Sequence, residues 1–244
     1  SRFWFDLTRD VMPNHMIGMA DDARALPDAE RVGALAELPS EMAPRSMVIR
    51  KAQRIDIECV VRGYITGSAW AEYRESGTVN GQAMPRGLVE AQELPEPIFT
   101  PSTKAESGHD APMTPEEVEN AVGSDLAREL EERSLGIFKM AQEHAASCGM
   151  IIADTKMEFG FVDGALILID ELLTADSSRF WAMDDYTPGK SPSPFDKQFV
   201  RNWLLESGWD RNPPAPPLPD EVVSLTRDRY LQAYRRLTGK TLQL

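Results

Sequence analysis

Cysteine, histidine and long apolar runs are scarce in this chain. Cys59 and Cys148 stand far apart in 244 residues, which favours reduced thiols in a cytosolic protein over a disulfide framework. His15, His109 and His144 have no metal-ligand spacing with either cysteine. No apolar run approaches the ~18 residues of a membrane span, and the first residues lack a signal-peptide layout. We therefore expect a soluble, cytoplasmic protein.

Basic residues are the second shortage. Lysine and arginine total 26 against 39 aspartates and glutamates, so the net charge is −13. We expect no nucleic-acid partner, which would need a basic stripe, and no anionic membrane surface. The acidic net charge does not exclude binding of small anionic ligands, because a few clustered arginines and lysines determine the local electrostatic field. A hydrophobic content of 42% over 244 residues supports one large domain or two lobes around a cleft.

Charged residues interrupt two apolar strand patterns between residues 154 and 181. They are Lys156, Glu158, Asp170 and Arg179. Ionised side chains inside a strand are costly to bury unless they pair or bind a metal. Two carboxylates beside two cations could hold a divalent cation against phosphate oxygens. The alternative is a solvated sheet face with incidental salt bridges.

The loop of the hairpin at Asp163-Gly164 decides whether these charges meet. Side chains alternate along a strand, so Lys156 and Glu158 share one face. A two-residue loop would put Asp170 opposite Met157 and away from Glu158. A three-residue loop pairs Lys156 with Asp170 and unites the three charges on one face, and we predict this register. The core face would then carry Met157, Phe159, Ile167 and Ile169.

Strand and helix signals lie before this hairpin. β-Branched runs predict strands over residues 47–50 and 55–64. Residues 76–112 hold many turn formers and no helical periodicity, and so long an irregular stretch is usually functional. Thr114-Pro115-Glu116-Glu117 predicts a helix start with a capping box.

Apolar spacing predicts further helices. One should begin at a Ser124 cap and stop at Gly149. The aromatic residues at helical spacing near residue 200, expected to form a core stripe, are Phe195, Phe199 and Trp203. A last helix, over about residues 220–237, should end at Gly239. Its expected buried residues are Val223, Tyr230, Ala233 and Leu237.

Three segments could bind anions, and none is specific alone. Arg62-Gly63-Tyr64-Ile65-Thr66-Gly67-Ser68 follows a strand and offers glycine backbone with Arg and Ser donors for phosphate. Thr100-Pro101-Ser102-Thr103-Lys104 offers hydroxyls and one ammonium, although a solvated loop lysine is the commoner outcome. His109-Asp110 could orient a ligand or stabilise a loop.

These segments belong to a longer ordered set. Its stretches are Glu58-Cys59-Val60-Val61-Arg62-Gly63-Tyr64 with Gly67-Ser68, Gly77-Thr78-Val79, Leu94-Pro95-Glu96-Pro97-Ile98-Phe99-Thr100-Pro101-Ser102-Thr103-Lys104, Gly108-His109-Asp110, Asp154-Thr155-Lys156-Met157-Glu158-Phe159-Gly160, Asp170-Glu171, Asp176-Ser177-Ser178-Arg179-Phe180-Trp181 and Phe195-Asp196-Lys197-Gln198-Phe199-Val200-Arg201. In this order, the set resembles the phosphoribosylaminoimidazole-succinocarboxamide synthase (SAICAR synthetase) family of purine biosynthesis. Any one stretch could arise by chance, whereas the ordered set is highly specific.

The resemblance implies an α+β fold of two lobes with antiparallel sheets and flanking helices. An ATP-binding cleft would lie between the lobes, as in kinase-like and ATP-grasp-like architectures. Residues 1–57 would be the remainder of a small N-terminal β lobe, because the family's glycine-containing N-terminal segment has no counterpart here. Residues 58–244 would form the larger α+β lobe with the substrate and metal site.

The reaction implied by the resemblance is an ATP-dependent ligation. The carboxylate of carboxyaminoimidazole ribotide (CAIR) would be activated as an acyl phosphate, and the amine of L-aspartate would then form the amide SAICAR, releasing ADP and phosphate. Glu158 and Asp170 match the carboxylates for Mg²⁺ and the nucleotide phosphates. Lys156 and Lys104 match cations on transferring or product phosphate. Lys156, Glu158 and Asp170 form the implied catalytic set.

The resemblance also implies substrate contacts. The clamp on the ribotide 5′-phosphate and neighbouring anionic groups would consist of Arg62, Ser68 and Arg179. Candidates for the carboxylates of aspartate, each with a structural ion pair as the alternative, are Lys190, Lys197 and Arg201. The chain has Ala175 where the family usually has proline, which loosens the loop before Arg179. Two other functions stay open: a related ATP-dependent carboxylate–amine ligase with another substrate, and a silent ribotide-binding homologue.

Overall fold

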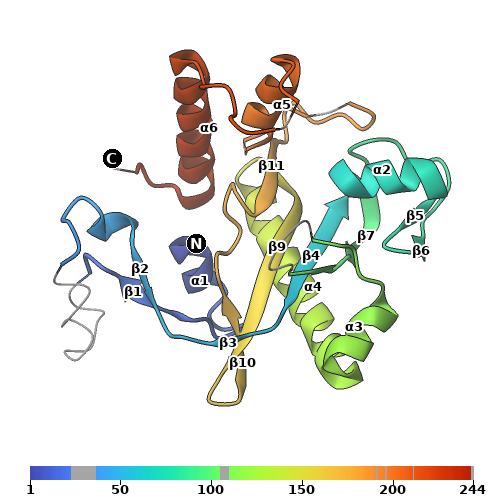
Figure 1. Cartoon of the computed structure of the whole chain (residues 1–244), viewed down its shortest axis with the longest axis horizontal. Coiled ribbons are helices and arrows are strands. Elements are labelled where there is room, and N and C mark those ends of the chain that lie inside the picture. The colour runs from blue at the N-terminus through green and yellow to red at the C-terminus, as the bar shows by residue number, and fades with distance from the viewer. Residues whose placement is uncertain (23–36, 105–109, 191, 196, 211, 243–244) are drawn as a thin grey trace.

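A computed structural model describes residues 1–22, 37–104, 110–190, 192–195, 197–210 and 212–242 (Figure 1). In chain order its elements are α1 (Arg2–Leu7), β1 (Met16–Met19), the short 3₁₀ helix η2 (Ala43–Arg45), β2 (Met47–Ile49), β3 (Gln53–Arg54), β4 (Ile57–Tyr64), α2 (Gly67–Ser76), β5 (Thr78–Val79), β6 (Gln82–Ala83), β7 (Glu93–Phe99), β8 (Ser102–Thr103), α3 (Pro115–Val122), α4 (Ser124–Ser147), β9 (Met150–Val162), β10 (Ala165–Ile169), β11 (Ser178–Ala182), α5 (Gln198–Glu206) and α6 (Asp220–Thr238). The α+β class with antiparallel sheets is confirmed.

The long strand β9 organises a seven-stranded sheet. On one edge, β11 pairs with residues 150–155 of β9, and β10 pairs with residues 158–162. On the other edge, β4 pairs with residues 154–157 and β3 with residues 160–161. β7 and β8 continue the sheet beyond β4. Each of these pairings is antiparallel, and β9 changes partners along its length on both edges.

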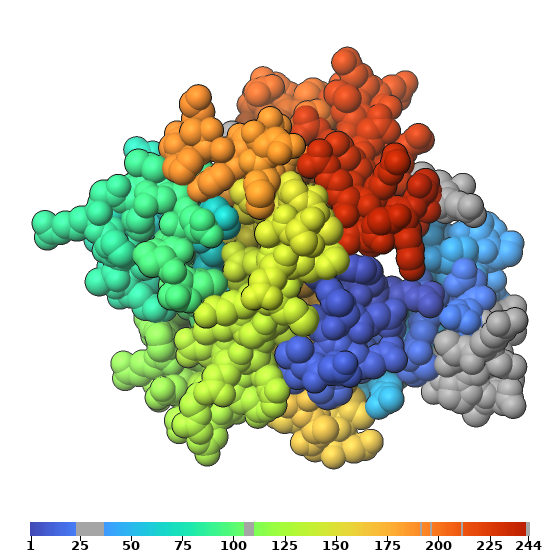
Figure 2. All heavy atoms as spheres, turned by 180° about the vertical axis from the view of Figure 1, so that it is seen from behind, coloured from blue at the N-terminus to red at the C-terminus, as the bar shows by residue number. Residues whose placement is uncertain are grey.

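The helix α4 covers one face of this sheet, as the front and back views together show (Figures 1 and 2). Cys59 faces α4, where it meets Ser134. Gly63 lies under Phe138, and a Cβ at Gly63 would come within 3.1 Å of that ring and 2.4 Å of the Gln142 amide. Because side chains alternate along a strand, the even-numbered residues of β4 face away from α4.

α1 and α6 lie beside α4 (Figure 2). His144 of α4 forms a 2.7 Å hydrogen bond between its Nε2 and the Leu237 carbonyl of α6. Its ring also packs against Phe3 and Trp4 of α1, with ring centroids 5.2 and 5.4 Å away. Trp4 belongs to the same buried apolar cluster as residues of β4, β9, α4 and α6. The predicted division of the chain at residue 57 stays a prediction.

The helix boundaries follow the capping signals closely. The capping box of α3 is confirmed: Thr114 Oγ1 accepts from the Glu117 N–H at 3.3 Å, and the Glu117 carboxylate accepts from the Thr114 N–H at 2.7 Å. The Ser124 cap is wrong by one residue, because Gly123 is the N-cap of α4. Gly239 ends α6 in the left-handed conformation, as predicted.

The predicted apolar faces of the last helices need correction. α6 buries Val222, Ala233 and Leu237, whereas Val223 and Tyr230 are exposed. At about 100° per residue, Val222, Ala233 and Leu237 fall within about 60° of one another, whereas Val223 and Tyr230 lie about 80–100° from Val222, at the margin of that face. Of the predicted aromatic stripe, Phe195 is buried but precedes α5, and none of the residues of α5 is buried.

The remaining sequence expectations concern strands and membrane spans. The strands predicted over 47–50 and 55–64 correspond to β2 and β4, and the turn-rich stretch 76–112 contains β5 to β8. Among the helices that the structure describes, none is both long and apolar enough to cross a membrane.

Candidate active site

The β9–β10 hairpin has a two-residue loop, so the predicted three-residue register is wrong. Val162 pairs with Ala165. The loop residues Asp163 and Gly164 both have positive φ, at 51° and 80°. An Asp-Gly pair is a favoured sequence for such a turn, which matches the twist of the strands. In this register Leu168 lies opposite Phe159 in the main apolar cluster, and Ile167 and Ile169 are buried, as predicted, but outside that cluster.

Asp170 nevertheless joins the charged residues of β9, because it leaves the strand. β10 ends at Ile169, opposite Glu158. If the ladder continued, Asp170 would lie opposite Met157 on the core face. Asp170 instead adopts a left-handed conformation with φ 64°, and its Oδ2 lies 3.9 Å from Lys156 Nζ. The side chain of Asp170 thus reaches Lys156, as predicted, but through a turn after β10 and not through the predicted strand register.

Two lysines and two glutamates form a compact group that we term the lysine cluster. Lys104 Nζ lies 3.0 Å from Glu58 Oε1 and 2.7 Å from Glu158 Oε1. Lys156 Nζ lies 3.1 Å from each of the same two oxygens. Both glutamates are buried. With Asp170 included, two positive and three negative charges leave the group with a net charge of −1.

Hydrogen bonding outweighs burial in setting the charges of this cluster. Burial raises the pKa of Glu158, but hydrogen bonds from Lys104 and Lys156 bring that pKa below its usual value. Burial lowers the pKa of both lysines, but hydrogen bonds with Glu158 and Glu58 raise it above its usual value. Both lysines are therefore charged at neutral pH. Burial and then the charge of Glu158 raise the pKa of Asp170, whose side chain is 47% exposed and forms the open end of the group.

A second polar group surrounds Asp154. Arg62 Nη1 lies 3.0 Å from Asp154 Oδ2, and Arg179 Nη1 contacts the same oxygen. Arg62 also donates from Nε to Thr100 Oγ1 at 2.9 Å and from Nη2 to Ser68 Oγ at 3.3 Å. Burial lowers the pKa of Arg62, and the charge of Asp154 opposes that shift. We term Arg62, Ser68 and Arg179 the arginine clamp.

The arginine clamp lies at the start of α2. Gly67, the first residue of α2, has φ 58°, and a Cβ there would come within 2.5 Å of Arg179 Nη2. Both the left-handed backbone and the close approach require glycine at this position. The N-terminus of a helix carries a partial positive charge, so α2 adds to the local attraction for an anion.

The two groups are neighbours on the face of the sheet that points away from α4. Arg62 pairs opposite Asp154, and Val60 pairs opposite Lys156. Asp154 and Lys156 are alternate residues of β9, so their Cα atoms are about 7 Å apart. The structure thus brings together most of the predicted site, namely Arg62, Ser68, Lys104, Lys156, Glu158, Asp170 and Arg179.

Sequence reasoning gave no functional role to two members of these groups, Glu58 and Asp154, whereas Thr100 belonged to a predicted anion-binding segment. A signal was available for both missed residues. Asp154 stands two residues before Lys156, and Glu58 stands four residues before Arg62, so strand alternation alone places each on the face of the site.

The predicted aspartate-binding residues lie outside both groups. Lys190 and Arg201 are exposed, and neither contacts the lysine cluster or the arginine clamp among the residues that the structure describes. Lys197 forms an ion pair with Asp176, with Nζ 3.1 Å from Oδ1. His109, a predicted ligand-orienting residue, lies outside the described residues.

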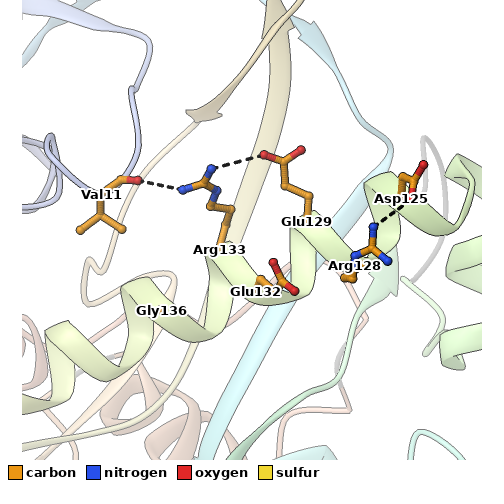
Figure 3. Close-up of a pocket in the computed structure, with 7 residues that line it drawn as sticks. All are labelled: Val11, Asp125, Arg128, Glu129, Glu132, Arg133 and Gly136. Atoms are coloured by element: carbon orange, nitrogen blue, oxygen red, sulfur yellow. Dashed lines mark hydrogen bonds and ion pairs between the residues drawn. The ribbon is translucent and has the colours of Figure 1, made fainter.

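Two surface hollows lie apart from this site. One, of about 420 Å³, is on α4 and the adjoining Val11 (Figure 3). Four of its five charged side chains are paired: Arg133 reaches Glu129 at 3.5 Å, as well as the Val11 carbonyl at 3.3 Å, and Arg128 lies 2.8 Å from Asp125. The other, of about 400 Å³, is lined by Gln198, Arg201, Leu204, Leu205 and Trp209.

Comparisons with known proteins agree on one family. The model of the family described as SAICAR synthetase matches residues 1–216. The chain is 50% identical over 248 residues to the phosphoribosylaminoimidazole-succinocarboxamide synthase of Saccharopolyspora erythraea, covering 99% of this chain and 79% of that protein. It is 48% identical over 239 residues to the protein of the same name from Thermodesulfovibrio yellowstonii, covering 98% and 80%.

Solved structures agree with the sequence comparisons. The SAICAR synthase of Saccharomyces cerevisiae, solved with SAICAR, matches with a TM-score of 0.85 at 39% identity, over 100% of this chain and 80% of that one. A SAICAR synthetase solved with ADP gives a TM-score of 0.69 at 22% identity, over 100% and 80%, a likeness that shows the fold alone. With a family model over most of its length and relatives near half identity, the chain belongs to the SAICAR synthetase family.

Proposed function

We propose that this chain catalyses the ATP-dependent ligation of L-aspartate to the carboxylate of CAIR, giving SAICAR, ADP and phosphate. The observation that carries the proposal is the placement of the arginine clamp beside the lysine cluster on one face of the sheet. Relatives about half identical to the chain are named for this product, and the yeast structure at 39% identity holds it.

The arginine clamp suits the 5′-phosphate of the ribotide. A guanidinium has five N–H donors in a planar fork that matches phosphate oxygens. Asp154 accepts from both arginines through one oxygen, so each guanidinium keeps other donors for a ligand. With Asp154 between them, the two arginines carry a net charge of +1, which attracts a phosphate without the full repulsion of two adjacent buried cations.

The lysine cluster suits phosphoryl transfer. In the first step an oxygen of the CAIR carboxylate attacks the γ-phosphorus of ATP, and the bond from that phosphorus to the ADP oxygen breaks. Lys104 and Lys156 would stabilise the charge on the phosphoryl oxygens, since Glu58 and Glu158 hold both ammonium groups in place. In the second step the aspartate amine attacks the acyl carbon, phosphate leaves, and the amine proton passes to solvent.

Asp170, at the open end of the cluster, and the neighbouring Glu158 fit Mg²⁺. Mg²⁺ prefers oxygen ligands and usually takes only one or two protein carboxylates, the rest being phosphate and water. Glu158 and Asp170 would supply these, and Asp170 is half exposed. Within the described ranges no group of three or more His, Cys, Asp or Glu side chains could hold a metal alone, so the nucleotide would have to complete the site. When bound, Mg²⁺ would neutralise charge on the phosphate oxygens.

The binding site for aspartate and the cellular location of the reaction are also proposals. Lys190 and Arg201 are exposed cations suited to the carboxylates of aspartate, and Arg201 lines the hollow of about 400 Å³. Lys197 is a weaker candidate, because it already pairs with Asp176. We place the reaction in the cytoplasm, in keeping with the free thiols of Cys59 and Cys148.

The test is a turnover assay with the purified chain. ADP release is followed with CAIR, ATP and Mg²⁺, and aspartate is replaced in turn by asparagine, glutamate and alanine. We expect ADP and SAICAR in equal amounts, with aspartate only. Turnover with another amine but not with aspartate would assign a related ligase, and CAIR binding without ADP formation would assign a silent homologue. Either result overturns the proposal.

A further inference from the structure

His15 is a buried residue that the proposed mechanism does not use. It lies between α1 and β1, and it is 3% exposed. Its backbone is fixed on both sides: its N–H donates to the Leu168 carbonyl at 2.9 Å, and its carbonyl accepts from the Arg50 N–H at 2.8 Å. The segment is also held by the Leu168 N–H, which donates to the Pro13 carbonyl at 3.0 Å. His15 is therefore anchored to the outer edge of β10.

The imidazole of His15 makes a specific polar contact with Asp170. Its Nε2 lies 3.1 Å from the backbone carbonyl oxygen of Asp170. A carbonyl oxygen only accepts, so the hydrogen bond assigns the proton to Nε2. The ring of Phe5 packs edge-on against the imidazole, with centroids 5.6 Å apart and planes at 63°. The anchored backbone of His15 and the packing of Phe5 against its ring together keep the Nε2–H group pointed at the Asp170 carbonyl.

Asp170 is the residue whose conformation decides whether the carboxylates meet. It leaves β10 with φ 64°, in a region that L-residues rarely occupy, although aspartate tolerates it better than most. An extended Asp170 would continue the β9–β10 ladder and point its carboxylate toward the core side. The carbonyl of Asp170 belongs to the same residue, so a donor that fixes its direction also restrains the turn.

We propose that His15 is a positioning residue: its Nε2–H group holds the Asp170 carbonyl and keeps the Asp170 carboxylate beside Lys156 and Glu158, ready for a divalent cation. This proposal depends on the proposed function in one respect: it takes Asp170 to be a ligand of the metal ion that accompanies the nucleotide. His15 is buried and its imidazole bonds the Asp170 backbone, so its role is exerted through Asp170. Partners that orient a metal ligand typically contribute 10–100-fold to metal affinity or activity, and we expect about that range here.

The experiment compares His15→Leu, which removes the donor, with His15→Gln, whose amide nitrogen can replace Nε2–H. Binding of Mn²⁺ to the full chain with ADP is measured by electron paramagnetic resonance of the free ion. We expect His15→Leu to weaken Mn²⁺ binding by about tenfold or more and His15→Gln to recover most of the loss. The KM for CAIR should stay within about twofold in both variants, because the arginine clamp does not contact His15.

The matched control is Thr8→Val in the same N-terminal segment. Thr8 is fully buried, and its hydroxyl donates to the Trp4 carbonyl at 2.8 Å. This variant also loses a buried hydrogen bond to a backbone carbonyl, but it loses none to Asp170. We expect it to lower thermal stability as His15→Leu does while leaving Mn²⁺ affinity unchanged.

The outcomes separate this proposal from the proposed function. Wild-type chain that binds Mn²⁺ with ADP but forms no SAICAR would overturn the function and leave His15 as the positioning residue. His15→Leu with unchanged Mn²⁺ affinity, or with equal losses of Mn²⁺ and CAIR affinity, would overturn the positioning role. Failure of the wild-type chain to bind Mn²⁺ would overturn both. If His15→Leu does not fold, a long-range ¹H–¹⁵N spectrum of the wild-type imidazole decides, since a proton on Nδ1 would contradict the hydrogen bond.

Discussion

Replacing Asp154 by asparagine tests the arginine clamp most directly. Asp154 Oδ2 is shared by Arg62 and Arg179, and the carboxylate is 7% exposed. The asparagine side chain would occupy nearly the same space but would carry no charge. The variant therefore leaves two guanidinium groups facing each other without a counter-ion in a largely buried place.

The magnitude follows from burial. Removing one partner of a buried ion pair costs about 3–5 kcal/mol of unfolding free energy. Arg62 is 11% and Arg179 25% exposed, so solvent reaches the second arginine, and we expect about 3 kcal/mol, the lower end. For a chain of this size each kcal/mol shifts Tm by about 2–4 °C. Asp154→Asn should therefore lower Tm by about 6–12 °C.

Differential scanning calorimetry of the full chain measures this shift, with Asp176→Asn as the control. Asp176 also pairs with a cation, Lys197, at 3.1 Å, but its side chain is 69% exposed. An exposed pair contributes about 0–1 kcal/mol, so this variant should lose less than about 4 °C. Inorganic phosphate should raise the Tm of Asp154→Asn more than that of wild type, because an anion that binds between the arginines replaces the missing charge.

Equal losses of Tm in the two variants would refute the reasoning, since burial would then have no influence on the pair. A phosphate effect that is the same in wild type and Asp154→Asn would refute the assignment of the clamp as an anion site. A large loss of Tm without any phosphate rescue would leave Asp154 as a purely structural counter-ion.

Further predictions concern catalysis and reactivity. Glu158→Gln should lower kcat by about 10²-fold or more with a smaller change in the KM for CAIR, because it removes the charge that holds the two lysines and the proposed Mg²⁺ at the transferring phosphate. Steady-state kinetics check this, and an unchanged kcat would contradict it. Arg179→Lys should raise the KM for CAIR by the equivalent of about 1.5–3 kcal/mol while the KM for ATP changes little. Burial raises the pKa of the Cys59 thiol to about 12, so iodoacetamide at pH 8 should modify only the half-buried Cys148 in the folded chain, as read by mass spectrometry.

Local signals in the sequence predicted most of the elements near the site. The capping box at Thr114 and the left-handed glycine after α6 depend on a few adjacent residues, so they could be read directly. The face of α6 could not be read with the same success. Val222, Ala233 and Leu237 are buried and Val223 and Tyr230 are exposed, although both sets recur at helical spacing, so periodicity alone does not tell which of two neighbouring faces packs against the rest of the protein.

The site shows which inferences strand alternation supports and which it does not. Alternation correctly placed Lys156 with Glu158, and it would have placed Asp154 there too. It could not predict on which face of the sheet Asp170 lies, because Asp170 follows the strand and its φ of 64° sets the direction of its side chain. The two-residue turn was signalled by the Asp163-Gly164 pair itself, and the prediction failed because it preferred the register that united the charges.

The site lies where β9 exchanges β11 for β10, and this exchange explains its combination of rigidity and access. At Lys156 neither strand covers that edge, yet the Lys156 N–H donates to the Ser177 carbonyl at 3.0 Å. On the other edge Lys156 lies opposite Val60 of β4. The backbone of Lys156 is thus held on both sides, while the loop between β10 and β11 can bring Asp170 over the sheet. An unbroken β9–β10 ladder would have carried Asp170 to the core face and closed the edge through which it reaches the lysine cluster.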